Sequence, residues 1–203
     1  MNNKHSNFAE VVESSLDHLT AQCWQWNRFP TFASLVQIQT PEETSVGIVT
    51  SIQTGSIEPG RTPFAYQKTE EELYAQQPQI FEFLKTTFIV HIIGYHDNTV
   101  NTFMHLLPNH PSKIHAFVKE AEKELAYSAL SNLHFLHILF SGASTIPYLD
   151  ELLLALIKNN KHVFKPEILD AFSQQFSLLT GNDYRRLKLF FMRLETIMLA
   201  QKD

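Results

Sequence analysis

The chain has 203 residues, of which 44% are hydrophobic and 18% charged, so it can form a folded core and is not a disordered tail. Its formal net charge is −5 and the acidic excess lies in residues 1–110, which argues against broad electrostatic capture of nucleic acid. The single cysteine excludes an intramolecular disulfide, and no apolar stretch is long enough to span a bilayer. With a polar N-terminus that lacks a signal segment, these features predict a location in the cytoplasm or the equivalent stroma of an organelle.

The first half of the chain shows the two-residue alternation that is typical of β-strands. We expect strands near residues 8–13, 19–24, 35–39, 45–53, 86–95 and 100–107. The fifth segment is apolar on both faces, which predicts a strand that is covered on both sides. Six short strands favour a small closed or nearly closed barrel at residues 7–117, interrupted by a helical excursion at 58–85 in which Thr69 is a candidate N-cap.

The second half shows helical patterns, and we expect a helical domain at residues 118–203. A first helix is expected from Lys119, and Pro147 and Pro166 suit the first turns of later ones. Gly181 is a natural helix end, and Asn182 or Asp183 can cap the last helix. In that helix an apolar stripe is predicted at Tyr184, Leu187, Phe191, Leu194 and Met198. The predicted fold class is therefore α+β, with an N-terminal six-stranded small β-barrel followed by a C-terminal α-helical domain.

One stretch of the first half has a pattern found in a known family. Residues 47–63 combine the strand start Gly-Ile-Val with the loop Ile-Glu-Pro-Gly-Arg-Thr-Pro, followed by Glu-Glu-Glu-Leu-Tyr at 70–74 and a strand that ends Gly-Tyr-His at 94–96. This pattern resembles the HAS barrel, which HerA-type DNA translocases share with the catalytic-ring subunits of rotary ATP synthases. It is most similar to short, stand-alone HAS-barrel proteins of the cyanobacterial type.

The resemblance implies a docking role, because in the motor proteins this barrel mediates assembly rather than nucleotide binding. The chain has six glycines, and none belongs to a Gly-x-x-x-x-Gly-Lys-Ser/Thr phosphate loop, so ATP hydrolysis of that type is not expected. The partner that the resemblance implies is a ring ATPase or a nucleic-acid-processing assembly.

The loop after the fourth strand carries the first candidate binding residues, Arg61, Phe64 and Tyr66, which have the composition of an interface anchor. The alternative is that the two aromatic side chains fold back on the barrel and that Arg61 pairs with Glu58.

The last helix carries the second group, the basic residues Arg185, Arg186, Lys188 and Arg193. They could contact phosphate or an acidic partner, and the alternative is an ordinary solvated helix face.

Catalytic, cofactor and metal sites are not predicted. His134 and His137 share a helix face without the further ligands that zinc needs, and Cys23 has the pattern of a small buried residue. The favoured function is that of a non-enzymatic assembly or adaptor protein whose barrel binds another protein. The alternatives are a nucleic-acid-associated factor that uses the basic last helix, and a small hydrolase without a recognisable motif.

Overall fold

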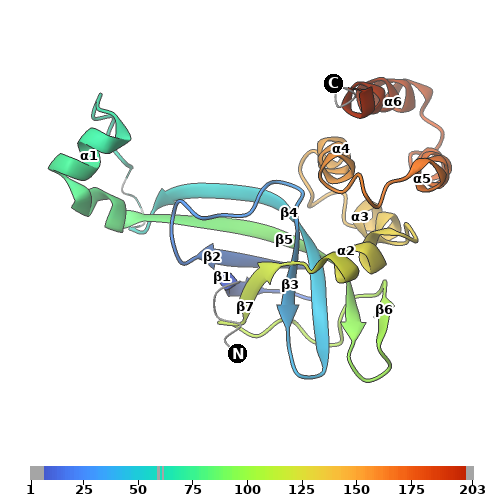
Figure 1. Cartoon of the computed structure of the whole chain (residues 1–203), viewed down its shortest axis with the longest axis horizontal. Coiled ribbons are helices and arrows are strands. Elements are labelled where there is room, and N and C mark those ends of the chain that lie inside the picture. Colours follow the sequence, from blue (N-terminus) through green and yellow to red (C-terminus); the bar gives the residue numbers. More distant parts are fainter. Residues whose placement is uncertain (1–6, 59, 61, 200–203) are drawn as a thin grey trace.

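The alternating residues of the first half form a closed antiparallel barrel (Figure 1), in a computed structural model that describes residues 7–58, 60 and 62–199. The six barrel strands are β1 (Asn7–Ser14), β2 (His18–Cys23), β3 (Leu35–Gln39), β4 (Glu43–Ser56), β5 (Leu84–Asp97) and β7 (Phe117–Glu120). The ring closes in the order β1, β2, β5, β4, β3, β7, and β7 pairs back onto β1. The short strand β6 (Thr102–Met104) pairs with β5 as a hairpin. The predicted α+β barrel with helices after it is thus confirmed.

The sixth barrel strand is β7, and the prediction of a barrel strand at 100–107 was wrong. Val118 is the one fully buried residue of β7, and the strand closes the ring by pairing with β1 on one side and β3 on the other. Lys119 and Glu120 therefore belong to a strand that runs past residue 117, and the helix expected from Lys119 starts at Lys123.

Strands β4 and β5 separate two apolar cores. Val49 and Val90 face the barrel interior, whereas Ile48 and Ile93 face outward into the core formed with the helices. Apart from the exposed Ile89, the central part of β5 is covered on both sides, as its apolar pattern predicted. The long strand pair therefore connects the barrel to the helical layer.

The helical layer follows the barrel in the chain and covers one part of its outer surface (Figure 1). Its helices are α2 (Lys123–Leu130), α3 (Phe135–Ser141), α4 (Leu149–Asn159), α5 (Pro166–Leu179) and α6 (Tyr184–Leu199). Pro166 occupies the first turn of α5, and Asp183 accepts a hydrogen bond from the backbone N–H of Arg186, as the capping patterns predicted. The α6 stripe packs inward except for Tyr184, which is exposed.

Candidate functional site

The arm, defined here as residues 57–83, is the connection between β4 and β5. These strands are each 14 residues long, and their pairing continues to Ser56 opposite Leu84. The backbone N–H of Ile57 donates to the carbonyl of Phe83 at 2.8 Å and closes the base of the arm. The arm contains α1 (Glu70–Gln76) and the 3₁₀ helix η2 (Pro78–Phe83), and α1 projects beyond the barrel at one end of the molecule (Figure 1). A segment held out in this way is accessible to a partner.

Local interactions determine the shape of the arm. Thr69 and Glu72 form a reciprocal capping box that starts α1, so Thr69 is confirmed as the N-cap. The ring of Phe81 stacks on the ring of Tyr74, with 3.9 Å between the centroids. It also stacks on the ring of Trp26, with 5.5 Å between the centroids. Neither α1 nor η2 contains a buried residue, and this aromatic stack joins α1 and η2 of the arm to Trp26, which follows β2.

The predicted residues Phe64 and Tyr66 lie in the arm and line a pocket of about 430 Å³, here called the arm pocket. Its other apolar wall residues are Pro63, Leu73, Ile80, Phe81, Phe83 and Leu84. Phe64 is 75% exposed and Tyr66 38% exposed, so Phe64 does not fold back on the barrel. Arg61 lies outside the described residues. The arm pocket is large enough for the apolar side chains of a partner segment, and its aromatic lining is typical of interface anchors.

The four basic residues of α6 have two different environments. The Arg186 guanidinium binds the Asp150 carboxylate of α4, with Nε 3.0 Å from Oδ2 and Nη2 2.5 Å from Oδ1. Arg193 forms a second two-pronged pair with Glu151, with Nη2 2.6 Å from Oε2. The hydrogen bonds that Arg186 donates to Asp150 raise the pKa of Arg186, and those that Arg193 donates to Glu151 lower the pKa of Glu151. These two arginines therefore hold α6 against α4.

The two remaining cations, Arg185 and Lys188, are exposed. Because Arg186 and Arg193 are already bound by carboxylates of α4, the four basic residues do not act as one cluster that could neutralise several phosphates. This arrangement weighs against nucleic acid as the principal ligand of the helix.

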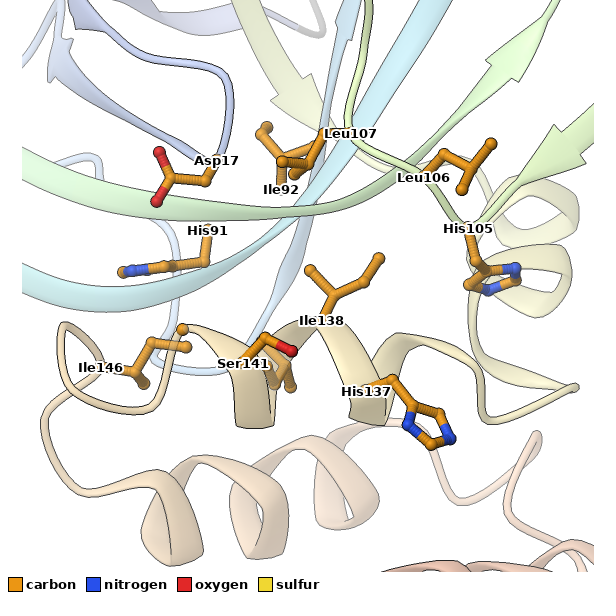
Figure 2. Close-up of a pocket in the computed structure, with 12 residues that line it drawn as sticks. Asp17, His91, Ile92, His105, Leu106, Leu107, His137, Ile138, Ser141 and Ile146 are labelled. Atoms are coloured by element: carbon orange, nitrogen blue, oxygen red, sulfur yellow. The ribbon is translucent and has the colours of Figure 1, made fainter. Parts of the chain in front are cut away.

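A second cavity, of about 440 Å³, lies between the barrel and α3 and was not found by sequence reasoning (Figure 2). We call it the histidine cleft, because His91 of β5, His105 after β6 and His137 of α3 line it together with Asp17 and mostly aliphatic side chains. These residues come from four segments far apart in the chain, so no local motif marks the cleft. The spacing of His134 and His137 was considered in the sequence only as a metal site and was set aside for lack of further ligands.

His91 has buried contacts on both ring nitrogens. His91 Nδ1 lies 2.9 Å from the Thr50 hydroxyl and Nε2 lies 3.4 Å from that of Thr145, while Asp17 and the stacked ring of His18 face it from the first hairpin. Burial, the largest cause, lowers the pKa of His91. Within residues 7–58, 60 and 62–199, no three or more His, Cys, Asp or Glu side chains are close enough together to hold a metal ion.

His105 is held in one tautomer. Its Nε2 donates to the carbonyl of Ala129 at 2.8 Å, and its Nδ1 lies 3.3 Å from the Asn132 side-chain nitrogen, which donates to it. The Asn132 oxygen accepts from the backbone N–H of His134, which fixes the amide orientation. Burial is the largest cause that lowers the pKa of His105; the neighbouring His134 ring lowers it further, and the hydrogen bond to the Ala129 carbonyl opposes this shift.

Acid should destabilise the fold through these histidines. Because their folded-state pKa values are lowered, the stability is fully present above about pH 6.5, the unfolded pKa, and is lost as the pH falls from there through the folded-state pKa. We expect the free energy of unfolding, from urea titrations between about pH 7 and 5, to fall with pH in the wild type and less steeply in His91→Gln. His162→Gln, at an exposed position, is the control and should keep the wild-type slope. Equal slopes for His91→Gln and the wild type would contradict this role for His91.

Cys23 offers little nucleophilic chemistry. It is buried in the barrel core, and burial raises the pKa of its thiol to about 11, so the reactive thiolate is rare near neutral pH. This environment weighs against Cys23 as the nucleophile of a hydrolase.

No protein-family model and no curated protein matches this chain. Among the described residues, no helix has the length and hydropathy needed to cross a bilayer. The arm pocket and the outer side of α6 are therefore interpreted from their own chemistry.

Proposed function

We propose that this chain is a non-enzymatic assembly protein of the cytoplasm that binds another protein through its arm. The observation that carries the proposal is the arm pocket, an apolar cavity on a projecting segment whose wall residue Phe64 is largely exposed. Large aromatic side chains left in water at the centre of a concave surface are the usual anchors of protein interfaces.

The chemistry around the arm pocket indicates the kind of partner. Glu70, Glu71 and Glu72 form the exposed acidic first turn of α1, and Glu82 is exposed in η2. A partner segment with bulky apolar side chains and neighbouring Lys or Arg residues complements this surface. The resemblance to HAS-barrel proteins supports an assembly role, and with it we propose a ring ATPase or a nucleic-acid-processing assembly as the partner class.

The test is a quantitative binding experiment with the full chain. The chain is immobilised, exposed to nuclease-treated native lysate, and the retained protein is identified and purified for titration. We expect Phe64→Ala/Tyr66→Ala to raise the dissociation constant at least about tenfold, because aromatic anchors at interfaces contribute about 2 kcal/mol or more to the free energy of binding.

Phe29→Ala is the matched control, because Phe29 is an exposed aromatic residue outside the arm. It should bind like the wild type, and amide exchange should show protection of residues 62–83 in the complex. Equal affinity of the arm variant and the wild type, or protection confined to another surface, would refute the arm as the binding site.

A further inference from the structure

The outer face of α6, defined as the side turned away from α4, carries both apolar and basic side chains. Arg185, Lys188, Leu189 and Met192 recur at the helical spacing i, i+3, i+4 and i+7, which places them on one side. Leu189, Met192, Tyr184 and Leu199 are between 55% and 76% exposed. The opposite side of α6 already contacts the helical core through Phe190 and Leu194, so α6 is apolar on both sides. A helix of this kind is normally covered on both sides.

The arm carries the complementary chemistry. The arm pocket accepts apolar side chains such as Met192 and Leu189, and the acidic first turn of α1 beside it suits Lys188 and Arg185. Within one molecule the two surfaces cannot meet, because α1 lies at one end of the long axis and α6 at the other (Figure 1). A contact between them therefore requires two molecules.

We propose that the arm of one molecule binds the outer face of α6 of a second copy, so that chains associate head to tail. This inference rests on the proposed function of the arm and names its occupant. Because the two patches differ, the contact is heterologous, and a pair of molecules keeps one free arm on one chain and one free α6 face on the other. Repetition of such a contact produces a closed ring if the rotation closes and a filament if it does not.

Two variants isolate the two halves of the contact. The arm variant is Phe64→Ala/Tyr66→Ala, and the α6 variant is Lys188→Glu/Met192→Glu; all four substituted side chains are exposed. Light scattering at about 100 µM, which populates contacts of micromolar affinity, measures the mass against the 23.4 kDa of one chain. We expect the wild type to form species larger than a dimer that dissociate on dilution and in high salt, and each variant alone to be monomeric.

The decisive sample is the equimolar mixture of the two variants. The arm variant retains an intact α6 face, and the α6 variant retains an intact arm, so one productive contact forms between them and growth stops at a one-to-one dimer. Circular dichroism and the unfolding midpoint of each variant show that it is folded, and Phe29→Ala should assemble like the wild type.

The other outcomes overturn the inference. A wild type that stays monomeric, variants that still assemble alone, or a mixture that stays monomeric would each exclude the head-to-tail contact. Two folded variants that lose assembly alone and stay monomeric when mixed would indicate a symmetric interface instead. The lysate titration separates this inference from the proposed function. If the wild type is monomeric and the arm variant no longer binds the protein that the wild type retains from the lysate, the arm binds a different partner but not a second copy.

Discussion

Phe176→Ala is expected to lower the free energy of unfolding by about 4 kcal/mol, because it removes the centre of the aromatic core of the helical layer. Phe176 of α5 is fully buried, and its ring lies 4.3 Å from that of Phe190, 5.7 Å from Phe172 and 5.9 Å from Phe140 between centroids. The Arg186 guanidinium also lies over it at 5.7 Å. Its removal would leave a cavity between α3, α5 and α6 that these large rings can only partly fill.

Urea denaturation measures this loss. An unchanged slope of the free energy of unfolding against urea concentration would show that the variant and the wild type undergo the same transition. Phe64→Ala is the matched control, since the same substitution at a side chain that is 75% exposed should change the stability by less than about 0.5 kcal/mol. A loss below about 1.5 kcal/mol for Phe176→Ala would mean that the helices collapse into the space, and that α6 is less firmly fixed than its contacts indicate.

The parts of the fold that could be predicted from the sequence are those that local chemistry decides. The alternation in β4, the apolar run of β5, the proline in the first turn of α5 and the Thr69 cap each depend on a few neighbouring residues. The arm was predicted for the same reason, since Pro and Gly residues interrupt the strand pattern after Ser56 and acidic residues start a helix at Glu70.

Strand β7 could not be predicted, because its conformation depends on residues far away in the chain. Its lysine and its glutamate continue into a run of good helix formers, so propensity alone favours a helix from Lys119. The backbone of Phe117–Glu120 is extended because β1 and β3 leave a gap between them that hydrogen bonds from these four residues close.

The candidate binding residues of the arm could be predicted from the sequence, whereas the environments of the α6 cations could not. Phe64 and Tyr66 are neighbours in the sequence, and their loop position was enough to propose them. The division of the α6 cations became visible only when Asp150 and Glu151 of α4 were seen to bind Arg186 and Arg193. Ion pairs between helices depend on tertiary packing, which the spacing within one helix does not reveal.

Gly47→Ala is expected to lower the free energy of unfolding by about 3 kcal/mol, although the change adds a single methyl group. Gly47 lies in β4 beside a register shift in the pairing with β5. A Cβ atom there would lie 2.4 Å from Val90 Cγ1 and 2.7 Å from the carbonyl oxygen of His91. The valine side chain is packed in the barrel core and the carbonyl is backbone, so neither can move without separating the two strands.

Gly55→Ala is the control within the same strand, because a Cβ at Gly55 meets no atom within 4 Å. Since alanine restricts the unfolded chain more than glycine does, this variant should be unchanged or more stable by up to about 1 kcal/mol. Urea denaturation of both variants gives the comparison, and equal stabilities would refute the close approach of β4 and β5 at Gly47. That approach matters for function because β4 and β5 continue directly into the arm, so separating them at Gly47 should also weaken binding by Phe64 and Tyr66.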